Sequence, residues 1–185
     1  MIATILPGSA DFHAVGYNEH KVYKGVATLL EMRNFGGLDA SEHPTAKQLV
    51  QFLQFYSSQN SRIQKPQFHV AISCKGHEMS EQQLLDFAHR YLQEMGYAEP
   101  GHPWLIYAHH DTDNTHLHIV TSRVSPDGRK IQHDHERRRS QTVIDKILGM
   151  DRQQKTDKDI EAAKQYSFSS FAQFKAVMGT MGYEV

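Results

Sequence analysis

The chain has 185 residues, of which 39% are hydrophobic and 22% are charged, and its formal net charge is −1 with His counted as neutral. These values are typical of a globular protein with one core, and the near-zero charge argues against a general DNA coat protein, whose affinity would rest on neutralising phosphates. No apolar run approaches the roughly 18 residues of a membrane span, and the first residues lack the basic region of a signal peptide, so we expect a cytoplasmic protein. The single Cys74 excludes an internal disulfide and a multi-cysteine zinc site, whereas 13 His residues are unusual.

The N-terminal third of the chain predicts one strand followed by two helices. Residues 2–6 form a short apolar strand that Pro7 ends. The pattern from 14 to 32 is mostly helical, with Gly25 as a break or kink. Thr45 is the expected N-cap of the next helix, whose apolar residues recur at helical spacing: Leu49, Phe52, Leu53 and Tyr56.

The segment after residue 66 predicts a strand and a capped helix. Alternation over residues 68–74 places the large apolar side chains on one face and His69 with small residues on the other. Ser80 and Gln83 have the spacing of a capping box, and Gly96 is a natural residue for the C-terminal end of that helix.

Residues 104–109 and 116–124 predict two further strands. The loop between them is too short for a parallel crossover, so the two strands should form an antiparallel hairpin. Strands interleaved with long helices in this order predict an α/β or α+β sandwich.

The C-terminal part is more polar and mostly helical. Residues 133–139 form a charged segment, and residues 140–148 predict a short helix. We expect a polar linker over 151–159, followed by a helix that Ser170 caps and that continues through Met178.

Three histidines in the predicted hairpin converge on one point. His116 and His118 are two residues apart on a strand, so both side chains leave the same face. His109 ends the preceding strand, and the hairpin brings it beside that pair. Three imidazoles with open positions for water and substrate are the arrangement expected of a catalytic cation. Asp111 could orient a ligand histidine from the loop or contact the cation through water.

His110 is the rival for the third ligand, but alternation should aim it away from the face of His109. Imidazole ligands suit manganese, zinc, nickel or copper better than calcium, and magnesium can bind through water.

The segment HHDTDNTHLHIVTSRV, at residues 109–124, resembles the metal-binding motif of mobilisation relaxases, which are HUH endonucleases (histidine, hydrophobe, histidine). The first residues, MIATILPGSADFHAVGYNEHKV, are similar to the relaxase start, in which a strand and a Gly-Ser turn precede the helix with the nucleophilic tyrosine. FHVAISC resembles the family's central strand, and the DGRKI and YSFSSFAQFKAVMGTMGYEV segments also fit. The resemblance covers most of the chain in the family's order.

The resemblance implies a two-layer α+β sandwich, in which a central antiparallel sheet with the HUH hairpin is flanked by α-helices. It implies site- and strand-specific nicking of single-stranded DNA at an origin of transfer, through a 5′-phosphotyrosine intermediate. Tyr17 stands where the motif has the nucleophile, Tyr23 is its rival, and His13 and His20 are weaker candidates. The implied cofactor is a divalent cation, for which we favour Mn²⁺ or Mg²⁺ over Zn²⁺. The implied partners are origin DNA and accessory mobilisation proteins.

A tyrosine has a pKa of about 10, so a nucleophilic Tyr17 needs deprotonation or polarisation near neutral pH. The cation, or a nearby base such as Asp111 or His69, could provide it. The chain departs in two places from the pattern of the family that it resembles. Family members often have a further histidine near Asn114, and an asparagine where this chain has residues 121–123. Both departures put DNA positioning and ligand orientation in doubt, but they leave the three proposed ligands intact.

The main concentration of positive charge follows the second hairpin strand. We expect its members to contact DNA phosphates, although acidic neighbours could instead make them an ordinary solvated surface. These residues are Arg123, Arg129, Lys130, Arg137, Arg138 and Arg139.

Three other functions compete with the relaxase interpretation. A rolling-circle replication initiator shares the HUH site, a hydrolytic metallophosphoesterase would not need Tyr17, and a binding module would hold DNA without cutting it. The position of Tyr17 ahead of the histidine motif favours a relaxase. We expect residues 1–185 to be a single relaxase domain, the N-terminal catalytic part of a longer protein.

Overall fold

The structure is a computed structural model that describes residues 1–74, 76, 79–149, 157, 160–164, 168 and 170–180. The chain forms two compact units, Met1–Ile144 and Asp145–Val185. Within the described ranges, no helix has the length and apolar character needed to cross a membrane.

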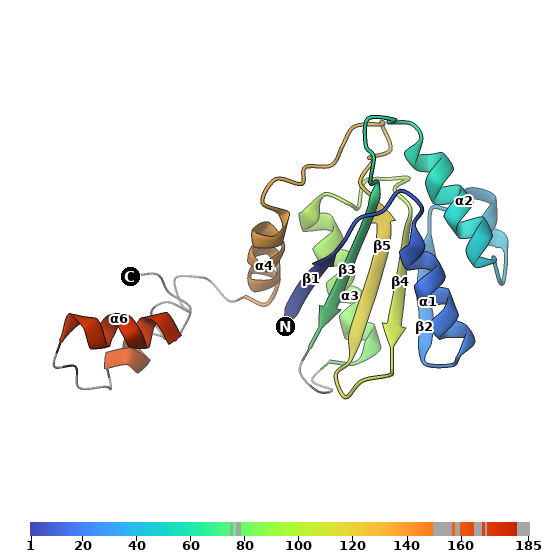
Figure 1. Ribbon diagram of the computed structural model, residues 1–185. Coiled ribbons are helices and arrows are strands. Elements are labelled where there is room, and N and C mark those ends of the chain that lie inside the picture. Colours follow the sequence, from blue (N-terminus) through green and yellow to red (C-terminus); the bar gives the residue numbers. More distant parts are fainter. Residues whose placement is uncertain are drawn as a thin grey trace. The chain divides into compact units, whose positions relative to one another are not determined.

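A five-stranded antiparallel sheet forms the centre of the first unit (Figure 1). Its order is β1-β3-β5-β4-β2, so the hairpin strands β4 and β5 lie inside the sheet with neighbours on both sides. The strands are β1 (Ile2–Leu6), β2 (Ala27–Arg33), β3 (Gln67–Ser73), β4 (Trp104–His109) and β5 (His116–Ser122).

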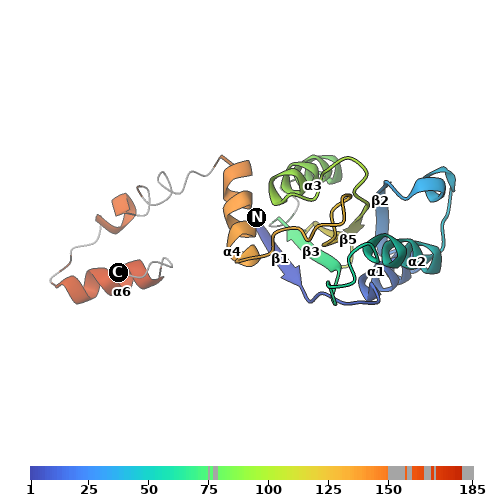
Figure 2. The ribbon, with the colours of Figure 1, turned by 90° about the horizontal axis from the view of Figure 1, so that it is seen from above.

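Helices cover both faces of this sheet. Figure 2 shows α1 (His13–Tyr23) and α2 (Ala46–Ser57) on one side and α3 (Glu81–Met95) on the other. The first side holds an apolar core in which buried residues of α1 and α2 meet the sheet, including Val15, Leu53 and Leu105. The predicted α+β class, with a central antiparallel sheet flanked by helices, is confirmed.

The predicted helix over residues 14–32 is wrong in its second half. The helix α1 ends at Tyr23, Gly25 turns the chain with a φ of 71°, and residues 27–33 form the edge strand β2 instead. The hydrogen bonds that β2 makes along β4 outweigh the helical pattern of its sequence, which is a preference that tertiary pairing readily overrides.

The other central elements agree with the sequence. Capping boxes begin α2 at Thr45 and α3 at Ser80, and Gly96 ends α3 in the left-handed conformation. The antiparallel hairpin of β4 and β5 is confirmed, although β5 ends at Ser122 rather than at residue 124.

Two C-terminal helices begin close to the positions that the sequence predicts. The helix α4 (Glu136–Ile147) starts four residues before the predicted position, within the charged segment. Ser170 Oγ accepts a hydrogen bond from the backbone N–H of Gln173 at 3.3 Å, and α6 (Phe171–Thr180) follows. The linker predicted at 151–159 lies outside the described residues, apart from the helical Asp157.

A buried histidine, His102, ties the start of β4 to α2 and β5. Thr121 Oγ1 donates to the carbonyl of Pro103, so it accepts from His102 Nε2 at 2.7 Å. Tyr56 can then donate to His102 Nδ1, 3.3 Å away. Burial lowers the pKa of His102 to about 4, which keeps the ring neutral and both ring nitrogens paired near neutral pH.

Acid should therefore destabilise the fold through His102. In the unfolded chain the ring binds a proton below about pH 6.5, whereas in the folded protein it does so only below about pH 4, so stability falls as the pH drops through this window. Between pH 7.5 and pH 5, the wild type should lose about 2 kcal/mol more of its free energy of unfolding than a His102→Gln variant. Urea unfolding of both proteins at the two pH values measures the difference, and equal losses would contradict it.

Candidate metal centre and its tyrosine

The pairing register of β4 and β5 builds a cluster of three histidines. His109 lies directly opposite His116, and His118 follows two residues later on the same face of the sheet. One potential ligand atom from each ring lies within 4.8 Å of the others. The rings of His109 and His118 stack with centroids 4.1 Å apart, and both are buried. The three predicted ligands are therefore brought together at one end of the central strands.

Hydrogen bonds use one nitrogen of each ring and leave the other for a ligand. Asn18 donates its amide to the carbonyl of Ala14, so its Oδ1 accepts from His109 Nε2 at 2.6 Å. The backbone carbonyl of Asn114 accepts from His116 Nδ1 at 3.0 Å. Such partners fix the ring orientation of metal-binding histidines. The nitrogens left for a ligand are then His116 Nε2 and His109 Nδ1, and the Lys21 ammonium lies 3.3 Å from the latter.

His69 is the hydrogen-bond partner that orients the third ring of the cluster, His118. Its Nε2 lies 2.8 Å from His118 Nδ1, so coordination through His118 Nε2 requires His118 to donate this hydrogen bond. His69 is itself buried on β3, which places it behind the cluster as a support for a ligand.

Burial keeps the cluster in the form that binds cations. It lowers the pKa of His109 to about 4, with the charge of Lys21 as the next cause, and lowers the pKa of His118 to about 2, with His109 as the next cause. Both rings are thus neutral at pH 7, as metal ligation requires. The three imidazoles of the cluster could hold a metal ion of the kind that accepts nitrogen ligands.

The rival ligand His110 points elsewhere, as strand alternation predicts. Its Nε2 lies 3.2 Å from Thr28 Oγ1, and its Nδ1 lies 3.5 Å from a carboxylate oxygen of Glu81. His110 is therefore engaged with β2 and α3 and is not among the clustered rings.

The helix α1 carries Tyr17 to the histidines. The Tyr17 ring centroid is 6.1 Å from that of His109 and 6.3 Å from that of His118, and the residue is 49% exposed. The start of the helix is anchored by Gln67, whose side-chain oxygen accepts from the backbone N–H of Ala14. Tyr17 is thus held beside the cluster with its ring open to an incoming molecule.

The other candidates for the nucleophile are arranged differently. Tyr23, at the last position of α1, is 89% exposed. His13 is exposed and pairs with Asp11, and His20 is also exposed. The described ring contacts link Tyr17, and none of these three, to the histidine cluster.

Lys21 was missed by the sequence reasoning. It follows Tyr17 by one helical turn, and its ammonium lies 5.0 Å from the centroid of the Tyr17 ring. The same ammonium donates to Asp111 Oδ2 at 2.6 Å and lies 3.3 Å from His109 Nδ1. This hydrogen bond lowers the pKa of Asp111, so the carboxylate stays ionised and is a poorer proton acceptor.

Comparison with known proteins bears directly on this site. The chain matches the family model described as relaxase, MobA/VirD2-like, nuclease domain, over residues 17–149, which is more than half of its length. The chain belongs to this relaxase family. The match includes Tyr17 and the whole histidine hairpin, and it makes the chain a DNA-nicking nuclease domain of mobilisation. Neither the curated proteins nor the solved structures gave a significant match.

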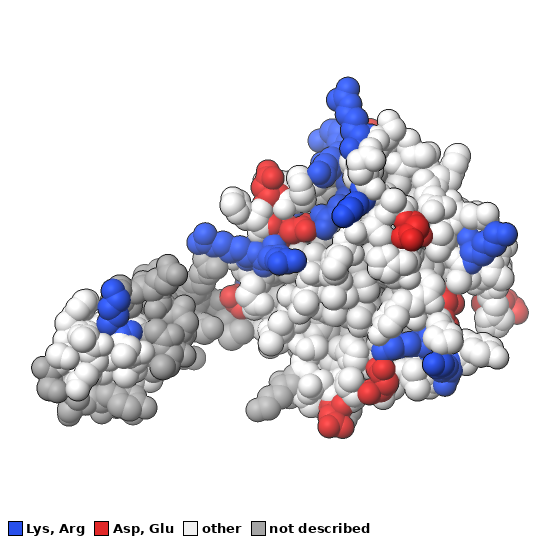
Figure 3. Space-filling model, viewed as in Figure 1, with Lys and Arg blue, Asp and Glu red and all other residues white. Residues whose placement is uncertain are grey.

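The six basic residues that the sequence predicted as DNA contacts of this relaxase lie away from its histidine cluster. They follow Ser122, at the end of β5 opposite His116. Figure 3 shows lysines and arginines on one face of the molecule in separate groups rather than in one continuous surface. Arg123 is buried, forms a two-pronged ion pair with Glu136 and lies 5.2 Å from the centroid of Phe68, which is the setting of a structural arginine.

The remaining basic residues are more accessible. Arg129 pairs with Asp127, and Arg139 donates to the carbonyl of Gln132 at 2.7 Å. Lys130 Nζ lies 3.1 Å from a ring nitrogen of His133. Arg137 and Arg138 are exposed on α4. DNA contact by any of these residues stays a prediction.

The histidine cluster should bind a divalent cation through its three members. We expect His116→Ala or His118→Ala to weaken Mn²⁺ binding at least about 100-fold, and Asn18→Leu to weaken it about 10-fold to 100-fold because His109 loses its orienting partner. Isothermal titration measures the affinities, with circular dichroism as the check of folding.

His110→Ala is the matched control, since it removes an adjacent imidazole that faces Thr28 and Glu81. It should leave the affinity for Mn²⁺ unchanged. An equal loss in the control and in His116→Ala would mean that the cation binds elsewhere.

Proposed function

We propose that this relaxase nicks single-stranded DNA at an origin of transfer by using Tyr17 as the nucleophile. The observation that carries the proposal is the half-exposed Tyr17 ring, whose centroid lies 6.1 Å from that of His109 and 6.3 Å from that of His118, within the range of aromatic contacts. Family membership supports DNA nicking in general, and the position of Tyr17 supports the covalent route.

In the proposed reaction, Tyr17 Oη attacks the scissile phosphorus and the bond from phosphorus to the 3′ oxygen breaks. The phenol proton is lost, and the departing 3′ oxygen takes up a proton to become a hydroxyl. The 5′ phosphate is then linked to Tyr17, which conserves the energy of the broken ester for later rejoining. A divalent cation held by His109, His116 and His118 would offset charge on the phosphate oxygens. We favour Mn²⁺ or Mg²⁺ over Zn²⁺.

The residues around Tyr17 take distinct parts in this proposal. Lys21 supplies a fixed positive charge beside the phenol, where it favours the phenolate and the incoming phosphate. Asp111 holds Lys21 in place, and His69 orients His118. We therefore assign Asp111 and His69 positioning roles in place of the base role that the sequence left open.

The covalent step can be tested by trapping a protein–DNA adduct. Single-stranded oligonucleotides from candidate transfer origins are incubated with Mn²⁺ or Mg²⁺ and the protein, then separated on a denaturing gel. The wild type and Tyr23→Phe should form the adduct, while Tyr17→Phe should lose it and nick at least about 10³-fold more slowly. His116→Ala should also lose it, because the cation site is broken.

Each other outcome points to a different function. Cleavage without an adduct, unaffected by Tyr17→Phe, would indicate a hydrolytic metallophosphoesterase. Tight binding without any cleavage of cognate DNA would indicate a binding module. An adduct formed only with replication-origin DNA would indicate a rolling-circle initiator. Accessory mobilisation proteins, which we also propose as partners, can be added to the same assay.

Lys21 offers a separate test of the electrostatic part. Lys21→Gln should slow nicking about 10-fold to 100-fold, because one fixed charge near the phosphate is lost. It should not weaken Mn²⁺ binding, because removing a like charge beside His109 favours a cation. Single-turnover nicking rates and Mn²⁺ titration are compared, with Lys21→Arg as the charge-preserving control. A loss of rate matched by a loss of Mn²⁺ affinity would contradict this role.

A further inference from the structure

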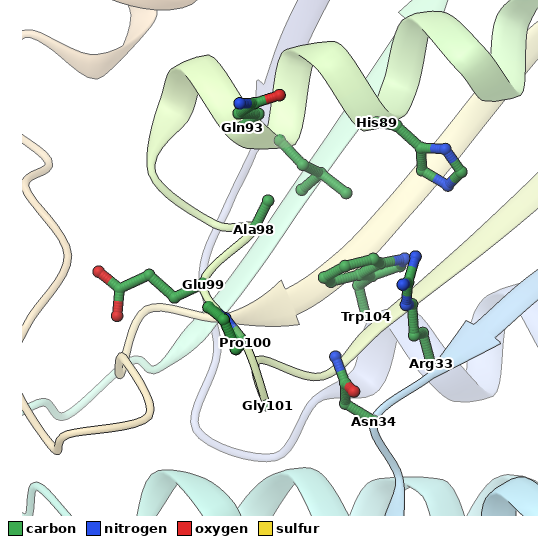
Figure 4. A pocket seen from close by; sticks show the side chains of 10 residues that line it. Arg33, Asn34, His89, Gln93, Ala98, Glu99, Pro100, Gly101 and Trp104 are labelled. Atoms are coloured by element: carbon green, nitrogen blue, oxygen red, sulfur yellow. The ribbon is translucent and has the colours of Figure 1, made fainter.

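A cavity of about 520 Å³ lies at the other end of the sheet from the histidine cluster (Figure 4). Its lining comes from the end of β2, the start of β4, the C-terminal half of α3 and the turn after α3. Its size suits a ligand of the dimensions of a nucleoside. None of the proposed metal ligands contributes to it.

One wall of the cavity is planar and cationic. Trp104 lines it, and the guanidinium carbon of Arg33 lies 5.3 Å from the centroid of the indole ring. Glu31 holds this wall in place because its two carboxylate oxygens accept from Trp104 Nε1 at 2.8 Å and pair with His89 Nε2 at 2.6 Å. The Arg33 side chain is 59% exposed, so its flat guanidinium is free to stack on a second planar group.

The rest of the lining combines apolar floor with hydrogen-bonding groups. Leu92, Ala98 and Pro100 supply apolar surface, and Gln93 and Glu99 supply an amide and a carboxylate at the rim. In Figure 4, Gln93 and Ala98 lie above the Trp104 ring, whereas the carboxylate of Glu99 extends away from it. A planar, heteroaromatic group with polar edges meets all of these features, whereas an aliphatic chain would leave the polar groups unused.

A second cavity, of about 390 Å³, adjoins the first and shares Gln93 and Glu99 with it. Its lining has three cationic side chains, Arg129, Lys130 and Arg139, against two carboxylates, Glu94 and Glu99, so positive charge is in excess. The Nε atom of Arg139 is buried and has no hydrogen-bond partner among the described residues, which leaves a donor available. A cationic cavity joined to an aromatic one fits a nucleotide unit, with the phosphate in the cationic cavity and the base in the aromatic cavity.

We propose that this double cavity holds one unpaired base and an adjoining phosphate of the single-stranded DNA on which the relaxase acts. The inference rests on the proposed function for its choice of DNA as the ligand. It assigns the exposed Arg33 guanidinium, which lies against the buried Trp104 ring, as the surface on which the base stacks, and Arg129, Lys130 and Arg139 as the contacts to phosphate.

The distance to the histidines makes this a recognition site separate from the chemistry. His109 follows Trp104 by five positions along β4, which is about 17 Å along a strand. Trp104 lies beside His89 of α3, whereas the histidine cluster lies beside Tyr17 of α1, so the cavity and the cluster are on opposite faces of the sheet. A stacked strand rises about 3.4 Å per nucleotide, so about five stacked nucleotides would span this length. The cavity therefore selects DNA by a base remote from the cut.

Trp104 is the single tryptophan of the chain, so its emission reports on the cavity alone. The full chain, in EDTA to prevent cleavage, is titrated with a mixed-sequence single strand of about 20 nucleotides. An abasic strand of the same length, with the same phosphates and no bases, is the matched ligand. The base-bearing strand should quench Trp104 and bind about tenfold more tightly than the abasic strand, which should bind without quenching.

Two variants test whether the base binds in the cavity. Ala98→Met fills the cavity, and Arg33→Gln removes the exposed guanidinium without disturbing the core. Each should weaken binding of the base-bearing strand about tenfold and leave the abasic strand unaffected. Ala172→Met, an exposed alanine of α6, is the control for the added side chain. Equal affinity for both strands, unchanged Trp104 emission, or variants that bind like the wild type would overturn the proposal.

The result is independent of the covalent chemistry. Tyr17→Phe should lose the adduct and still show Trp104 quenching. Quenching without any nicking would sustain the base site and reject the nicking function, whereas nicking without quenching would do the reverse.

Discussion

The site depends on the antiparallel register that sets His109 opposite His116. Side chains on a strand alternate between faces, so a shift of one residue between β4 and β5 would send His109 to the opposite face from His116 and His118. The register is held from both sides, because β3 pairs along β5 and β2 pairs along β4. A metal centre made from one hairpin is thus fixed by the whole sheet.

The same sheet positions the groups that complete the site. The strand β3 brings His69 to within hydrogen-bonding distance of His118, and α1 lays Asn18 against His109. Because α1 packs its apolar residues into the core beneath it, its polar face is directed at the cluster, with Tyr17 and Lys21 one turn apart. The helix α1 therefore supplies the proposed nucleophile Tyr17, the hydrogen-bond partner Asn18 that orients His109, and the positive charge of Lys21.

Charge is divided between the two ends of the molecule's sheet. Burial lowers the pKa of His109 and of His118 at one end, so positive charge there depends on Lys21 and on the cation that we propose for the cluster. The arginines after β5 gather at the other end, beside α3, where one of them is already committed to Glu136. This separation explains how a chain with net charge −1 can act on DNA: it offers local cationic sites rather than a uniformly basic surface.

The sequence by itself determined the histidine hairpin, the Thr45 N-cap, the Ser80 capping box and the α+β class, because each follows from short-range spacing. The proximity of Tyr17 to the cluster was expected only through family resemblance. The tertiary structure alone decided that residues 27–33 form an edge strand, since pairing with β4 outweighs their helical pattern. It also decided the contacts of Asn18 and Lys21, which lie about 90 residues from their partners, and the buried pairing of Arg123. Local pattern carries no information on such contacts, because they exist only once distant elements have packed.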